Sequence, residues 1–91
     1  MSAKVHILKI NEDYADSVLS GDKNFEVRIN DRGFQKGDVV QFTPVGRKNG
    51  LKIKHALWLK EYEITYVLGS FVGLADGYVA FGIKEIEGGE A

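Results

Sequence analysis

The stretch GDKNFEVRINDRGFQKGD, residues 21–38, carries the signals from which the fold can be predicted. Its residues 25–29 alternate apolar and charged side chains with the period of two that is typical of a β-strand. Two clusters of turn-forming residues, 30–33 and 36–38, follow this strand and introduce the next one. We expect the apolar members of the strand to face the core and the charged members to face the other way, which places Phe25, Val27 and Ile29 inside and Glu26 and Arg28 outside.

The segment before this stretch predicts one strand and one short helix. Residues 5–10 alternate and are rich in β-forming residues. Asn11 is a good helix N-cap, and Glu12 and Asp13 follow it in the first turn, where the helix dipole favours acids. Gly21 stands where a left-handed C-cap is required, so we expect a helix over residues 12–20.

The segment after this stretch predicts further strands. Residues 39–43 read as a strand that Pro44 ends or confines to an edge, and residues 46–50 read as a basic loop. Residues 51–68 are long enough for one or two strands with a bend or bulge. An apolar loop over 69–77 and a closing strand over 78–86 complete the chain. In the long segment we expect one shared side for Trp58, Tyr62, Ile64 and Tyr66.

One early helix among five or more strands predicts a strand-rich α+β fold. Strands that must hide their edges close into barrels, so we expect a small mixed β-barrel whose early helix caps one opening. This packing leaves a cleft between helix and barrel. A chain of 91 residues suffices for one hydrophobic core and not for two. We therefore expect a single domain over residues 1–87 and a flexible tail over 88–91.

The composition restricts the chemistry of the chain. It contains no cysteine and only two histidines, which excludes a disulfide framework, an iron–sulfur cluster and a zinc ribbon. We expect no metal and no cofactor. The N-terminus has no signal region, and no apolar run approaches the roughly 20 residues that span a bilayer. We therefore expect a cytoplasmic monomer that does not engage membranes.

Charge is distributed unevenly along the chain. The net charge is −1, yet residues 23–60 hold nine Lys or Arg against three acids, and the acids are concentrated elsewhere. Such a chain could present a basic face to an anionic partner while its acidic part keeps it soluble. The alternative is that the lysine-rich strands and hairpins are solvated edges.

The densest group of charges comprises Lys23, Glu26 and Arg28. On a strand, Glu26 and Arg28 point the same way about 7 Å apart. Lys23 can join them if the glycine at the end of the helix lets the chain turn. Lys23 and Arg28 could then hold a phosphate, with Glu26 or a neighbouring Asp31 accepting a hydrogen bond from a base or ribose. The alternative is an exposed ion pair that contributes less than about 1 kcal/mol.

The pattern GxKxxExR over residues 21–28, placed between a short helix and a Gly-Asp strand start, resembles the signature of the ASCH domains, which belong to the PUA-like superfamily of small β-barrels. The pattern HxLK at residues 6–9 and NDRxFxxGD at residues 30–38 are similar to an uncharacterised bacterial and phage branch of that group. The run GYVAFGI at residues 77–83 resembles the closing strand of the family. The resemblance thus covers nearly the whole chain and is weakest over residues 47–60.

The resemblance implies a PUA-like fold with a cleft beside the helix that binds RNA or a nucleotide-like molecule. Some ASCH-like proteins resemble amidohydrolases of acylated cytidines that use a Lys, Thr and Glu set, and others resemble ribonucleases. In the amidohydrolases the Thr lies three residues after the motif Lys, and here Glu26 occupies that position, so the nucleophile is missing. Our candidate ligand-binding residues are Lys23, Glu26, Arg28, Asp31, Arg32 and Lys9, and our candidate catalytic residues are Lys23, Glu26 and His6.

Two further groups of residues could contribute. His6 would suit general acid/base chemistry at neutral pH. It lies on the opposite face of its strand from Lys9, so we expect at most one of them to reach the cleft. Arg47, Lys48, Lys52 and Lys54 could follow a nucleic-acid backbone, or form a charged hairpin that protects an edge strand. Among the aromatic residues that could stack on bases, we expect core positions for all but Phe34 and one of Trp58 or Tyr62.

Three functions remain open from the sequence. The first is an RNA- or nucleotide-binding module, for which DNA is also possible. The second is a small hydrolase of modified nucleosides or RNA. The third is a protein-interaction or phage regulatory module in which the motif merely builds the barrel.

Overall fold

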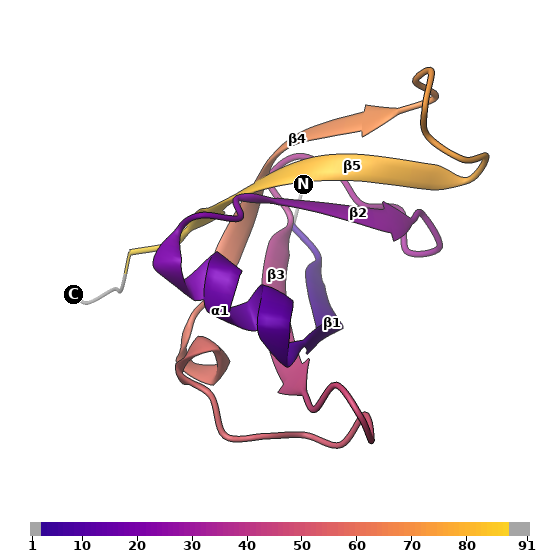
Figure 1. The fold of residues 1–91 in the computed structure, drawn as a ribbon. Helices are drawn as coiled ribbons and strands as arrows, with labels where there is room; N and C mark the ends of the chain where they lie inside the picture. The colour runs from indigo at the N-terminus through magenta and orange to yellow at the C-terminus, as the bar shows by residue number, and fades with distance from the viewer. Residues whose placement is uncertain (1–2, 88–91) are drawn as a thin grey trace.

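The computed structural model describes residues 3–87, which form one curled sheet of five strands with one α-helix and one 3-10 helix (Figure 1). The fold is small, strand-rich and α+β, as the sequence predicts. The predicted tail, residues 88–91, lies outside the described residues. The elements in chain order are β1 Val5–Asn11, α1 Glu12–Ser20, β2 Phe25–Ile29, β3 Val39–Val45, η1 Ala56–Leu59, β4 Tyr62–Gly69 and β5 Tyr78–Glu85.

The sheet has the strand order β1-β3-β4-β5-β2. β1 and β3 are parallel, and all other neighbours are antiparallel. The sheet curls into a half-barrel, so its edge strands β1 and β2 approach one another along a seam (Figure 1). Side chains cross this seam where a closed barrel would have a ladder of backbone hydrogen bonds. The mixed sheet of the prediction is thus present, but the barrel is only half closed.

α1 has the bounds that its capping residues predict. The Asn11 side chain accepts a hydrogen bond from the N–H of Asp13, and Gly21 ends the helix in the left-handed conformation with φ 90°. Ala15 and Val18 are the buried residues of the helix, which packs against β1, β3 and η1. Of the helices within residues 3–87, none combines the length and the apolar content needed to cross a membrane.

The orientation of β2 is opposite to the prediction. Phe25, Val27 and Ile29 are exposed, whereas Glu26 is only 4% exposed. The period of two determines which residues share a side, but it does not determine which side is buried. Here the charged side faces inward because β2 is an edge strand whose inner side meets the seam, and because Glu26 finds cationic partners there.

β3 continues through Pro44 to Val45, two residues beyond the predicted end. Proline lacks an N–H and cannot donate to a sheet ladder, but its carbonyl can accept. β4 pairs with β3 only at Val39 and Val40, and beside Pro44 the neighbour is the segment 52–53, where the Ile53 N–H donates to the Pro44 carbonyl at 3.2 Å. β3 lies between β1 and β4 in the sheet, so both alternatives of the prediction, a strand end and an edge position, are wrong.

The segment 51–68 is less extended than predicted. A 3-10 helix replaces a strand at residues 56–59, so Trp58 belongs to no strand ladder. The predicted irregularity is confirmed as a register shift between Ile64 and Tyr66. This shift turns Tyr66 outward, where it is 64% exposed, while Ile64 is fully buried. The expectation of one shared side for these residues is therefore wrong, because the extra residue at the bulge reverses the alternation.

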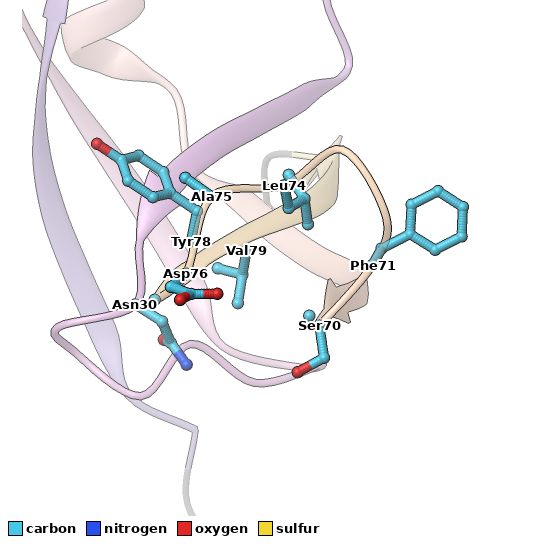
Figure 2. Close-up of a pocket in the computed structure, with 10 residues that line it drawn as sticks. Asn30, Ser70, Phe71, Leu74, Ala75, Asp76, Tyr78 and Val79 are labelled. Carbon is cyan, nitrogen blue, oxygen red and sulfur yellow. The ribbon is translucent and has the colours of Figure 1, made fainter.

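The core contains residues from every strand except β2, together with α1, η1 and the turn before β3. Phe34, expected outside the core, is 4% exposed and its ring lies 4.8 Å from that of Phe81. Phe71 is 58% exposed, although a core position was expected. It lies at the tip of the β4–β5 hairpin, where no element packs over it within the described chain (Figure 2). The buried apolar side chains are Leu8, Ile10, Ala15, Val18, Phe34, Val40, Phe42, Leu57, Tyr62, Ile64, Val79, Phe81 and Ile83.

The bulge in β4 requires a glycine on β5. A Cβ atom at Gly82 would lie 2.7 Å from Thr65 Oγ1, whereas a Cβ at Gly69 would meet only Val79 Cγ1 at 3.5 Å. We predict that Gly82→Ala lowers the free energy of unfolding by about 1–3 kcal/mol through steric overlap. Gly69→Ala, the matched control, should change it by less than about 0.5 kcal/mol. Urea unfolding of both variants tests this, and equal effects would contradict it.

Candidate functional site

The structure brings Lys23, Glu26 and Arg28 together. Lys23 Nζ lies 2.6 Å from Glu26 Oε2, and Arg28 Nε lies 3.1 Å from Glu26 Oε1. The left-handed Gly21 turns the chain so that the backbone N–H of Lys23 donates to the carbonyl of Ser17 at 2.9 Å. The Glu26 side chain is 6% exposed, against 17% for Lys23 and 25% for Arg28. Both carboxylate oxygens are thus occupied by the protein itself.

The ammonium group of Lys23 is also held by its own surroundings. It donates to the Phe25 carbonyl at 2.8 Å and lies 5.6 Å and 5.1 Å from the ring centroids of Tyr14 and Phe25. Aromatic faces attract cations at this range. Lys23 and Glu26 therefore stabilise the turn between α1 and β2. The ammonium group of Lys23 and the carboxylate of Glu26 are both engaged by other groups of the protein.

Two arginines cross the seam between the edge strands. Arg28 Nη2 donates to the carbonyl of Lys9 at 2.8 Å, and Arg32 Nη1 donates to the carbonyl of Ile7 at 3.2 Å. Alternate carbonyls of a strand point to the same edge, so these two acceptors lie on the side of β1 away from β3. The guanidinium groups supply the donors that a neighbouring strand would otherwise provide. Lys9 takes part through its backbone only, and its side chain faces outward with its exposed neighbours on β1.

A cavity of about 310 Å³ opens beside these arginines. Asp31, whose side chain is 66% exposed, lies 3.8 Å from Arg32 at the mouth of the cavity. Lys23 lines a different hollow, of about 240 Å³, between the end of α1 and strands β4 and β5. The predicted residues therefore do not share one cleft. The seam cleft is lined by Leu8, Val27, Arg28, Ile29, Asp31, Arg32, Phe34 and Tyr78.

His6 belongs to a separate buried pair. Its Nε2 lies 2.8 Å from Asp38 Oδ2, and its ring centroid lies 4.7 Å from that of Phe34. Asp38 also accepts from the backbone N–H groups of Lys4 and Gln35. Within residues 3–87, no hydrogen bond joins His6 to the Lys23–Glu26–Arg28 cluster. His6 therefore helps to tie β1 to the start of β3.

Asp38 is a residue whose role the sequence reasoning missed, since it was assigned only to a turn. Burial alone would raise the pKa of Asp38, but the hydrogen bonds from His6, Lys4 and Gln35 together outweigh burial and hold the pKa below the ordinary value of 3.8. The Gly-Asp strand start was the available signal. A carboxylate directly before a buried strand is well placed to accept several backbone N–H groups.

The basic loop forms a third region. Arg47 pairs with Asp13 at 2.7 Å, so its charge is partly neutralised by this carboxylate in the first turn of α1. Trp58 is 45% exposed, its indole N–H donates to the Ile53 carbonyl at 2.8 Å, and Lys52 Nζ lies 5.7 Å from its ring. A cavity of about 580 Å³ is lined by Lys52, Ile53, Lys54, His55, Trp58 and Leu59. Lys48 stands in the exposed turn of the same loop.

Another hollow, of about 540 Å³, lies under the β4–β5 loop (Figure 2). Asn30 and Asp76 border it, and Phe71 points away from it. No Lys, Arg or His side chain lines this hollow. It is therefore unsuited to an anionic ligand.

Comparisons with known proteins agree with the phage and bacterial resemblance. The model of a family described as "Domain of unknown function (DUF3850)" matches residues 5–83. An "Uncharacterized 12.9 kDa protein in GpA 3'region" of Escherichia phage P2 is 34% identical over 85 residues, which span 81% of this chain and 78% of that protein.

Removal of the Glu26 charge should destabilise the fold. We predict that Glu26→Gln lowers the free energy of unfolding by about 1.5–3 kcal/mol, because two partly buried cations lose their shared acceptor. Glu63→Gln on the exposed side of β4 is the matched control and should have an effect below about 0.5 kcal/mol. Chemical denaturation measures both. A negligible effect of Glu26→Gln would show that the cluster is not structural.

The Asp38 carboxylate should make stability depend on acidity. The pKa of Asp38 is lowered on folding. Its contribution to the free energy of unfolding is therefore complete above about pH 3.8 and is lost as the pH falls through the lower pKa of the folded protein. We predict that the difference in unfolding free energy between the wild type and Asp38→Asn shrinks as the pH is lowered from about 5 to about 2. Urea titrations at several pH values measure this difference. A constant difference over this range would refute the prediction.

Proposed function

We propose an RNA- or nucleotide-binding function for this chain, which belongs to the DUF3850 family of unknown function. We place the binding site at the seam cleft between β1 and β2. We also propose that the half-barrel with its early helix is a PUA-like fold of the ASCH type, a proposal supported by the motif over residues 21–28.

The observation that carries this proposal is the pair of anchored arginines beside an open cleft. A guanidinium has five N–H donors. The contacts to Glu26 and Lys9 engage two donors of Arg28, and the contact to Ile7 engages one of Arg32. The remaining donors of two pre-positioned guanidinium groups suit the oxygens of a phosphate. Pre-positioning favours binding because less side-chain freedom is lost when the ligand arrives.

The other groups at the cleft complete a nucleotide-like site. Asp31 offers an exposed carboxylate that can accept a hydrogen bond from a base or a ribose hydroxyl. The volume of about 310 Å³ is at the low end of small-molecule sites, which range from about 300 to 1,000 Å³. We therefore expect one nucleotide, free or within a single strand, and no duplex. Lys23 and Glu26 then act indirectly, because they hold Arg28 in place.

The basic loop extends the proposed interface for longer ligands. Exposed Trp58 with Lys52 beside it has the composition of a stacking platform for single-stranded nucleic acid. Lys48 and Lys54 could neutralise backbone phosphates, and Arg47 should contribute less because Asp13 already pairs with it. RNA is the favoured ligand, and DNA is a second possibility that a binding comparison distinguishes.

A hydrolase function has weaker support. Lys23 is engaged by a carboxylate, a carbonyl and two rings, and Glu26 stands where the similar amidohydrolases have Thr. His6 is 5% exposed and hydrogen-bonded to Asp38, which limits its access to a substrate.

Binding to labelled single strands tests the proposal. We predict that a short RNA binds at micromolar protein in low salt, and that Arg32→Ala weakens binding at least tenfold, or about 1.4 kcal/mol. Arg32 is about half exposed, so this variant should retain its fold. Fluorescence anisotropy with RNA and DNA of one sequence, at two salt concentrations, gives the affinities.

Lys84→Ala is the control, since it removes one positive charge from β5 at an exposed position outside the cleft. It should alter the affinity less than twofold. An equal loss of affinity in both variants would show that binding depends only on the overall charge and not on Arg32. Absence of binding in low salt would overturn the proposal.

A further inference from the structure

The outer face of β2, β5 and β4 is apolar. Because β2 turns its charges inward, Phe25, Val27 and Ile29 point outward at 48%, 48% and 52% exposure. Cross-strand pairing continues this surface over three strands, since neighbours in register share a face. The rows are Phe25–Gly82–Tyr66, Val27–Ala80–Leu68 and Ile29–Tyr78, and none contains a charged residue.

No described element covers this face within residues 3–87. Figure 1 shows β4, β5 and β2 side by side, and α1 packs against β1, β3 and η1. We call the surface formed by Phe25, Val27, Ile29, Tyr66, Leu68 and Tyr78 the apolar sheet face. The hairpin tip after β4 adds Phe71 and Val72, which are 58% and 92% exposed.

The exposed area of the apolar sheet face is comparable with that of an interaction patch. An aromatic side chain offers about 150–250 Å². Phe25, Tyr66 and Tyr78 are exposed by 48%, 64% and 37%, which together corresponds to about one and a half whole aromatic side chains, or roughly 220–370 Å². With Val27, Ile29 and Leu68 the face falls within the range of about 300–600 Å² of the largest apolar patch of a monomer, a patch that is often functional. The face can thus supply a large part of the roughly 800 Å² that each partner buries in a stable interface.

We propose that the apolar sheet face is the interface of a homodimer in which two copies pack face to face about a twofold axis. A face without charge offers nothing to recognise an acidic or basic partner, but it is complementary to itself. Two-fold dimers use the same patch on both subunits, and sheets pack well face to face at about 10 Å. This state differs from the monomer that we expect before the structure is considered.

The dimer does not rest on the proposed RNA function. Val27, Ile29 and Tyr78 border both the apolar sheet face and the seam cleft, so the two clefts would lie at the margin of the interface. Arg32, on which the binding test relies, lies outside the apolar sheet face. A failure of RNA binding would therefore leave the dimer testable, and a failure of dimerisation would leave RNA binding testable.

Molar mass as a function of concentration tests the dimer. We predict that the mass from analytical ultracentrifugation rises toward twice that of the chain between about 1 µM and 1 mM protein. Val27→Glu should weaken association at least tenfold, because it places a carboxylate in the middle row of the buried face. Ile7→Glu is the matched control, an exposed apolar position on β1 at 59% exposure, and should leave association unchanged.

A single introduced cysteine gives an independent measurement in a chain that has none. Under mild oxidation, Ala80→Cys, on the middle strand and in the middle row of the face, should form a disulfide-linked dimer faster than Ile7→Cys, because equivalent positions near a twofold axis through the face come together. Spectra of both variants should match the wild type. A monomeric mass at all concentrations, or equal cross-linking of both cysteine variants, would overturn the proposal.

Discussion

The buried carboxylate of Glu26 is the interaction on which the rest of the structure depends. A carboxylate removed from water requires charged or hydrogen-bonding partners, and Lys23 and Arg28 provide them. This pairing turns the charged side of β2 inward and its apolar side outward. Arg28 also reaches the carbonyl of Lys9, so the group that satisfies the carboxylate also holds together the two edge strands of the half-barrel.

This arrangement divides the charges of the motif between stability and recognition. Lys23 and Glu26 are saturated by contacts within the protein, whereas Arg32 and Asp31 keep exposed groups at the cleft. A second polar tie, between His6 and Asp38, connects β1 with β3 on the other side of the core. Polar side-chain contacts thus hold the half-barrel together where backbone hydrogen bonds between strands are missing. The arginines that make these contacts across the seam also leave N–H donors available beside it.

The success of sequence reasoning differs from element to element. The bounds of α1 were predictable because Asn11 and Gly21 act locally, through contacts within a few residues. The 3-10 helix at Trp58 was missed because aromatic and β-branched residues favour strands, whereas His55 caps a turn there by accepting from Leu57. The exposure of Tyr66 was missed because one extra residue in β4 reverses the alternation without a strong local signal.

The sequence by itself determined the strand-rich class, the bounds of α1 and the alternation of β2, and it indicated how Lys23 could join Glu26 and Arg28, because these follow from short-range geometry. Only the tertiary structure decided which side of β2 is buried. That choice depends on the position of the strand in the sheet and on carbonyls of β1, which lie 19 and 25 residues away from the arginines that bind them. A pattern with a period of two is symmetric with respect to its two faces, and only contacts between distant segments remove that symmetry.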